Sequence, residues 1–153
     1  MLNFAEWLAG TEWSIALHES LYWYPWIESS HVLFICIFFG TLLFVDLRLT
    51  GKVFTNLSIS EMNKGILPLT IVGFCLMTLT GLLLFYAIPV RNYQNIFFRI
   101  KILLIIIAGL NALFFHRRMS KEAKKWDKDS SIPKSMKVSA IASLFTWSLV
   151  IIS

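Results

Sequence analysis

The chain has 153 residues, of which 57% are hydrophobic and 15% are charged, and its formal net charge is +5. A soluble domain of this length would carry far more charge, so the composition excludes an ordinary soluble domain and indicates a membrane protein. The basic excess does not require a nucleic-acid partner, because Lys and Arg in a membrane protein report the orientation of its loops.

The N-terminal segment, residues 1–24, has neither a basic start nor a continuous apolar core, so we do not expect a secretory signal peptide. Its aromatic side chains favour the headgroup level of a bilayer, and they include Trp7, Trp13, Tyr22, Trp23 and Tyr24. The segment therefore predicts one amphipathic helix at the membrane interface. We expect Pro25 to end this helix and to begin the next, since proline is tolerated in a first helical turn.

Four apolar stretches follow and predict membrane-spanning helices at about 26–49, 66–88, 95–116 and 136–153. The first three approach the roughly 20 residues that cross a bilayer core about 30 Å thick. None alternates apolar and polar residues, which disfavours a β-barrel. Short connections make neighbouring spans antiparallel, so the predicted fold is all-α, a four-helix up-down bundle forming a single membrane domain over residues 1–153.

Small residues within the spans predict close approach between helices, although they would also leave room for a flat cofactor. They are Gly40, Thr41, Gly73, Thr80, Gly81, Ala108, Gly109 and Ala112. Cys36 and Cys75 both fall inside predicted spans, where the interpretation as small buried hydrophobes is favoured over a disulfide or a metal pair.

Charge predicts the orientation of the bundle. Residues 1–47 contain no Lys or Arg, whereas the segment after the third span is strongly basic, with Arg117, Arg118, Lys121, Lys124, Lys125, Lys128, Lys134 and Lys137. Cytoplasmic loops are enriched in Lys and Arg, so we expect 117–137 inside and the N-terminus and the 89–95 turn outside.

The first span carries a polar group near each end, His31 and Asp46. Fifteen positions place them about 60° apart around a helix and about 22 Å apart along it. Glu28, one turn before His31, is a candidate for orienting its ring. Asp46 has a structural alternative, in which it pairs with Arg48 or caps donors at the inner interface.

The third span repeats the pattern with Lys101 and His116, and has Asn111 between them. Lys101 either extends to the outer headgroups or faces a site shared with His31. Ionisable groups inside a membrane are costly, which favours a function for a His and a Lys in one layer. Asn111 predicts an interhelical hydrogen bond, and His116, beside two arginines, predicts an interfacial residue.

Three stretches, "HVLFICIFFG", "LTGLLLF" and "NIFFRIKILLIIIAGLNALFFH", resemble the membrane superfamily that includes the copper-resistance D domain and the membrane-type protoporphyrinogen oxidase. The chain is more similar to a group of short four-helix bacterial inner-membrane proteins with "DLRL-G" after the first span. The resemblance covers about residues 26–118 and implies a location in the bacterial inner membrane. In the oxidase branch, a tryptophan often precedes this lysine. This chain has Phe97, Phe98 and Arg99 there instead. The difference argues against the oxidase reaction more than against the fold.

The resemblance also implies a site for haem b, to which the oxidase branch contributes residues matching His31 and Lys101. Neutral imidazole ligates haem iron, so His31 is the expected metal ligand. Arg91, Arg99 and Lys101 are candidates to pair with the propionates. A second imidazole would come from His18 if the N-terminal helix folds inward; the alternatives are ligation by one histidine alone, a Lys partner, or a ligand from another subunit.

Two hypotheses therefore lead: a small haem-binding redox or electron-transfer protein with its site near the outer face, and a non-catalytic accessory subunit packed against other membrane subunits. A transporter or copper-uptake component is weaker, because copper(I) prefers sulfur ligands and Met62, Met77, Met119 and Met136 form no spaced cluster. No catalytic residue is assigned, and whether the protein is an enzyme stays open. The expected partners are the lipid bilayer and other membrane proteins, without nucleic acid.

Overall fold

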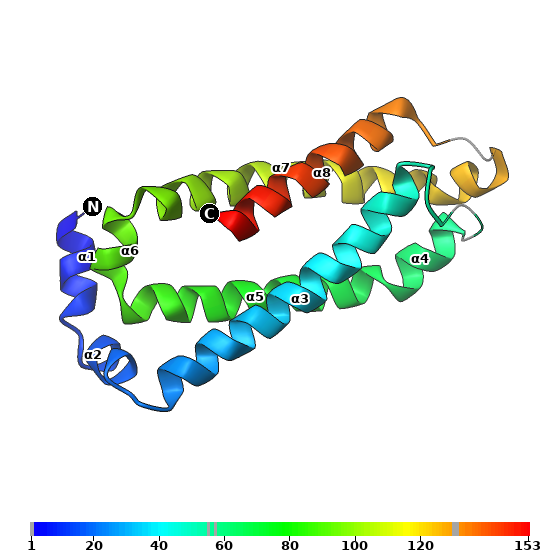
Figure 1. Ribbon diagram of the computed structural model, residues 1–153. Helices are drawn as coiled ribbons and strands as arrows, with labels where there is room; N and C mark the ends of the chain where they lie inside the picture. The colour runs from blue at the N-terminus through cyan, green and yellow to red at the C-terminus, as the bar shows by residue number, and fades with distance from the viewer. Residues whose placement is uncertain (1, 55, 57, 130–131) are drawn as a thin grey trace.

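The computed structural model describes residues 2–54, 56, 58–129 and 132–153, with side chains described outside 63, 115–116 and 118–129. These residues form α-helices only (Figure 1): α1 (Leu2–Ala9), α2 (Glu12–His18), α3 (Trp23–Leu49), α4 (Ile59–Gly65), α5 (Leu67–Ala87), α6 (Pro89–Gln94), α7 (Ile96–Asp129) and α8 (Lys134–Ile152). Four helical stretches are long and apolar enough to cross a membrane. The predicted all-α bundle of four spanning helices, preceded by short N-terminal helical structure, is confirmed.

The N-terminal segment is two short helices rather than the predicted single one. α1 ends at Ala9, and Thr11 begins α2 by accepting a hydrogen bond from the Ser14 amide at 3.4 Å. Gly10 has a low helix propensity and Thr11 is a favourable N-cap residue, which explains the break. Pro25 does not end this segment, because α2 already ends at His18, but it lies in the first turn of α3 as expected.

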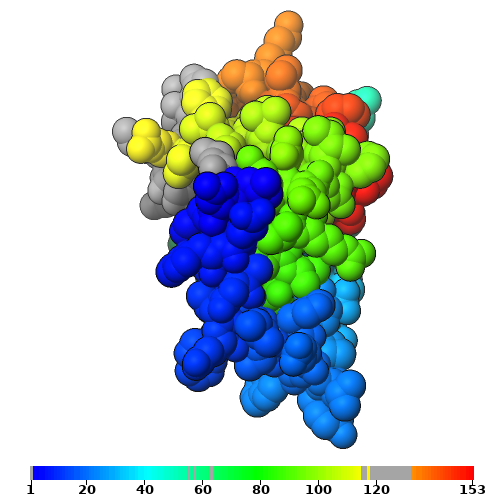
Figure 2. All heavy atoms as spheres, turned by 90° about the vertical axis from the view of Figure 1, so that its left-hand side faces the viewer, coloured from blue at the N-terminus to red at the C-terminus, as the bar shows by residue number. Residues whose placement is uncertain are grey.

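Tyr86, at the end of α5, fastens the N-terminal helices to the bundle. The Thr11 hydroxyl donates to the Leu8 carbonyl at 2.7 Å, so the Tyr86 hydroxyl donates to Thr11 Oγ1 at 2.8 Å. The Ser14 hydroxyl donates to the Tyr86 carbonyl, also at 2.8 Å. Figure 2 shows the resulting placement, with the dark blue N-terminal helices lying across this end of the molecule against the green segment that contains α6. We call this end the α6 end, and the opposite one the α4 end.

The spanning helices form two closely packed pairs, α3 with α5 and α7 with α8, and α3 also contacts α8 (Figure 1). Gly73 lets α5 approach the main chain of α3 at Phe38. α3 ends as predicted near residue 49, where Gly51 adopts the left-handed conformation typical of a helix end, with φ of +76°. α7 contains the third predicted span, with its apolar part at Ile96–Phe114, and continues beyond it as a helix to Asp129.

Two buried apolar clusters hold the pairs together. One lies towards the α4 end and contains Val45, Leu49, Ile59, Met62, Met136 and Ala140. The other lies at mid-depth and contains Phe38, Ala108, Trp147 and Val150, with the Trp147 ring edge-on to Phe38 at a centroid distance of 4.7 Å. Apolar side chains outside these clusters face outward along all four spans, as lipid-facing surface does.

Some of the small residues that were predicted to lie at contacts between helices do not lie there. Gly73, Gly81 and Ala108 lie at helix contacts as predicted, but a methyl group added to Gly40 or Gly109 would meet nothing within 4 Å. Cys36 and Cys75 are free thiols on the outer surface, so the expectation that they are buried is wrong. The physical reason is shared: apolar character alone does not distinguish a lipid-facing position from a core position in a membrane helix.

Candidate functional site

His31 lies on α3 in the half of the bundle nearer the α6 end, and its ring is hydrogen-bonded to Thr80 and to the main chain of Met77. Nδ1 lies 2.9 Å from the Oγ1 of Thr80 on α5. That hydroxyl points its single hydrogen at the main-chain carbonyls of its own helix, with Oγ1 at 2.8 Å from the Leu76 oxygen and 3.1 Å from the Met77 oxygen. Thr80 therefore accepts from His31, and the neutral ring carries its proton on Nδ1 and its lone pair on Nε2.

Gly81 provides the space in which this ring sits. A methyl group at Gly81 would lie 3.1 Å from the Cε1 atom of His31, closer than ordinary van der Waals contact. Thr80 and Gly81 thus act together, one by accepting a hydrogen bond and the other by lacking a side chain. The ring is half-buried in the resulting recess between α3 and α5.

Lys101 comes from α7 into the same layer. Its side chain is half-buried, and its ammonium group is close enough to interact electrostatically with the His31 ring. The two residues that the sequence placed at one depth are thus within electrostatic range of each other. His31 and Lys101 form the candidate site, with Thr80 and Gly81 as its supports.

The two arginines expected near this site are exposed. Arg99 is engaged by Tyr93, because its Nε donates to the Tyr93 carbonyl at 2.9 Å and its guanidinium lies 4.8 Å from the centre of the Tyr93 ring. Arg91 lies in the last turn of α6. Both are surface groups at the α6 end rather than walls of the recess around His31.

His18 is not brought to His31 as a second ligand. It ends α2, is exposed, and packs edge-to-face against Tyr24 with a centroid distance of 6.3 Å. Within the described ranges, no group of three or more His, Cys, Asp and Glu side chains is arranged to hold a metal ion.

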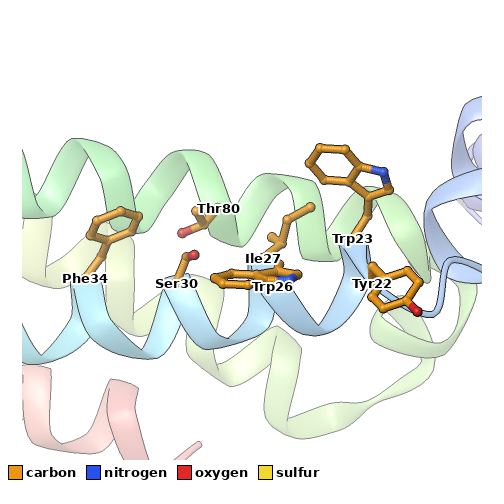
Figure 3. Close-up of a pocket in the computed structure, with 7 residues that line it drawn as sticks. All are labelled: Tyr22, Trp23, Trp26, Ile27, Ser30, Phe34 and Thr80. Carbon is orange, nitrogen blue, oxygen red and sulfur yellow. The ribbon is translucent and has the colours of Figure 1, made fainter.

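An aromatic groove with a volume of about 670 Å³ runs along α3 beside the site (Figure 3). It is open to the surroundings and is lined by Tyr22, Trp23, Trp26, Ile27, Ser30, Phe34 and Thr80. In Figure 3 the Thr80 side chain projects from α5 towards α3, near Ser30. Because Thr80 also binds His31, it is shared by the groove and the recess.

Thr80 is the site residue that sequence analysis missed. Glu28, the expected partner of His31, is exposed, and Thr80 accepts the Nδ1 hydrogen bond instead. The spacing along the two helices would have indicated this pairing: His31 and Phe38 are seven positions apart on α3, and Gly73 and Thr80 are seven positions apart on α5. Once α3 and α5 are antiparallel with Phe38 against Gly73, position 80 falls opposite position 31.

The polar residues nearer the α4 end are arranged differently. The expected interhelical bond of Asn111 is present, since Asn111 Nδ2 donates to the Ser139 carbonyl at 3.0 Å and the Ser139 hydroxyl donates to Asn111 Oδ1 at 2.7 Å. Asp46 is buried against α8, where Ser143 hydrogen-bonds to its carboxyl. The side chain of His116 lies outside the described residues.

No protein-family model matches the chain, and neither a curated protein nor a solved structure is significantly similar to it. The family expected from the three stretches is thus still a prediction, and function has to be argued from the site itself.

Proposed function

We propose that this protein is a small membrane redox protein that binds haem b near the α6 end, with His31 as an iron ligand. The observation that carries the proposal is the fixed tautomer of His31. Its Nδ1 hydrogen is held by Thr80, which leaves the Nε2 lone pair for a metal. Ligating histidines usually have their second ring nitrogen held in this way by a hydrogen-bond acceptor.

The donor set fits one axial position and offers a candidate for the second. Lys101 is half-buried in the same layer, so its side chain supplies either an amine ligand or a positive charge suited to a propionate. His18 is held against Tyr24 and does not take part. Bound haem would supply one-electron transfer, while the protein would set its potential through the ligands and their burial.

The proposed orientation follows from charge. The N-terminal half of the chain reaches Arg48 before its first basic residue, whereas 117–137 is dense in Lys and Arg. We infer a bacterial inner membrane with the α6 end outside and the α4 end inside. The His31 site then lies near the outer face, where it would exchange electrons with an external partner.

A second candidate, an accessory subunit of a larger membrane complex, is supported by the surface of α7. Among the span residues 96–114, Ala108 is the one fully buried side chain that is described. Gly109 has open space beside it, as a helix–helix contact with another subunit would need. Gly40 on α3 is equally open.

The decisive experiment is the absorption spectrum of the protein purified from cells with an ample haem supply. We expect a haem Soret band that His31→Ala abolishes and His18→Ala leaves unchanged, because His18 is the matched histidine outside the site. Lys101→Met should weaken or shift the band while the thermal unfolding temperature is retained. A colourless wild-type protein would overturn the haem proposal and leave the accessory role, which native mass spectrometry of the extracted complex would then test, using Gly109→Leu as the disrupting variant.

A further inference from the structure

Asp46 is the most deeply buried acidic side chain of the described spans, and the proposed haem site does not use it. It lies in the last turns of α3 with 4% of its surface exposed. Ser143 on α8 hydrogen-bonds to the carboxyl, but the second oxygen, Oδ2, is buried without a hydrogen-bond partner. A buried carboxylate oxygen without a donor is costly inside a membrane, so a bound proton or cation is expected at this position.

The surroundings of Asp46 exclude water on most sides. Its neighbours along α3, Val45 and Leu49, belong to the apolar cluster that includes Met136 and Ala140 of α8. One turn beyond Ser143 on α8, the indole N–H of Trp147 is also buried without a partner. The carboxyl therefore lies in a low-dielectric interface between α3 and α8.

The neighbouring polar pair, Asn111 and Ser139, does not donate a hydrogen bond to the Asp46 carboxyl. Asn111 and Ser139 bond reciprocally, with the amide donating to the Ser139 carbonyl and the Ser139 hydroxyl donating to the amide oxygen. The two residues are thereby hydrogen-bonded to each other between α7 and α8. Ser143 is left as the hydroxyl that serves Asp46.

Charged side chains occur on most elements around this end, but none of those described donates to Oδ2. They are Arg48 on α3, Glu61 and Lys64 on α4, and Lys134 and Lys137 on α8. Helix α5 has no charged side chain. On α7, the side chains beyond Arg117 lie outside the described ones. Glu61, Lys64 and Lys134 are exposed. The Lys137 ammonium lies against Gly51, beyond the end of α3.

From this geometry we propose that the Asp46 carboxyl is a proton-binding site within the bundle. An ionised carboxylate in an apolar interface without a bonded cation is strongly disfavoured, and a proton removes the charge without requiring further ligands. The step balances simply: the carboxylate takes a proton from hydronium in water at the α4 end and releases water, and the reverse step returns the proton. The proposal is independent of haem binding.

The test uses dicyclohexylcarbodiimide, a lipid-soluble reagent that adds to a protonated carboxyl and rearranges to a stable acylurea. The full-length protein is reconstituted in phospholipid vesicles, treated across a pH series and analysed by peptide mass spectrometry. We expect one adduct, on the peptide that contains Asp46, with a labelling rate that falls as the pH rises. Asp46→Asn should abolish the adduct, and Glu61→Gln, at an exposed acid of the same end, should leave it unchanged.

A second measurement does not depend on access of the reagent to the interface. The infrared spectrum of wild-type protein minus that of Asp46→Asn should contain the carbonyl stretch of a protonated carboxylic acid at neutral pH. A carboxylate signal in its place would overturn the proposal. Protection from the carbodiimide by sodium chloride, but not by choline chloride at equal ionic strength, would also overturn it in favour of a sodium site.

Discussion

Phe38 and Gly73 bring the main chains of α3 and α5 together: a methyl group on Gly73 would lie 3.1 Å from the Phe38 nitrogen and 3.2 Å from its Cα. Main-chain atoms cannot rotate out of the way as a side chain can. The contact therefore fixes both the separation of the two helices and the register that places Thr80 opposite His31.

Gly73→Ala should consequently destabilise the protein, by about 1–3 kcal/mol as for other overpacked interiors. The matched control is Gly40→Ala, because nothing lies within 4 Å of its added methyl group. There the better helix propensity of alanine predicts a neutral or slightly stabilising effect, up to about 1 kcal/mol. Thermal unfolding in detergent measures both, and equal effects would show that Gly73 is not a close contact.

Thr80→Val removes the acceptor of His31 Nδ1 with little change in volume. We expect a loss of about 0.5–1.5 kcal/mol of stability, the usual worth of one hydrogen bond. Nitrogen NMR of labelled histidine should report a single neutral tautomer in the wild type and a mixture in the variant. Thr78→Val, at an exposed position of the same helix, should leave both measurements unchanged; a mixed tautomer already in the wild type would refute the assignment.

Asn111 and Ser139 should be energetically coupled. A double-mutant cycle with Asn111→Leu and Ser139→Ala is expected to give a coupling of about 0.6 kcal/mol and at most roughly 1.7, the range for interhelical hydrogen bonds in membranes. Thr146→Ala serves as the control partner, because Thr146 bonds to the Ala142 carbonyl of its own helix. Its cycle with Asn111→Leu should be additive, and coupling there as large as at Ser139 would contradict the pairing.

Tyr86→Phe should loosen the N-terminal helices. The change deletes the hydroxyl that donates to Thr11 but keeps the carbonyl that accepts from Ser14. Hydrogen exchange measured by mass spectrometry should therefore accelerate in residues 2–18, with α5 itself unaffected. Tyr22→Phe is the control at a highly exposed tyrosine, and identical exchange in both variants would exclude the anchoring role.

The proposed orientation predicts opposite labelling of the two ends. In a background with Cys36→Ala and Cys75→Ala, a membrane-impermeant maleimide should modify Asn92→Cys in intact cells and Lys134→Cys only after permeabilisation. The two positions lie in α6 and at the start of α8. The reversed pattern would invert the topology and place the His31 site on the cytoplasmic side.

The four spans were predictable because a run of about 20 apolar residues has few other structures available to it in a protein. The site was predictable in part. The depths of His31 and Lys101 follow from counting along helices, but the bond to Thr80 joins residues 49 positions apart and depends on which helices pair. The break at Gly10 was missed because aromatic content suggested a continuous surface helix, whereas the Thr11 cap decides where α2 begins.

The Asp46 carboxyl was located by sequence, and of its two expected structural roles the structure shows the one in which it accepts from a nearby donor. A pairing with Arg48, two positions along the same helix, was one expectation, yet side chains two apart on a helix do not face each other. Ser143, nearly a hundred residues later, supplies the hydrogen bond instead. Such a partner becomes visible only when α8 is placed against α3.

The attachment of the N-terminal helices to Tyr86 has a consequence for biosynthesis. Thr11 and Tyr86 are 75 residues apart, and a ribosome adding about 5–20 residues per second makes the second residue about 4–15 seconds after the first. During that interval the tryptophan-rich segment lacks the α5 and α6 surfaces that it later contacts, and the lipid headgroup region is the environment suited to its aromatic rings. Docking at Tyr86 is thus a late event, which can begin only after the α3–α5 hairpin has been synthesised.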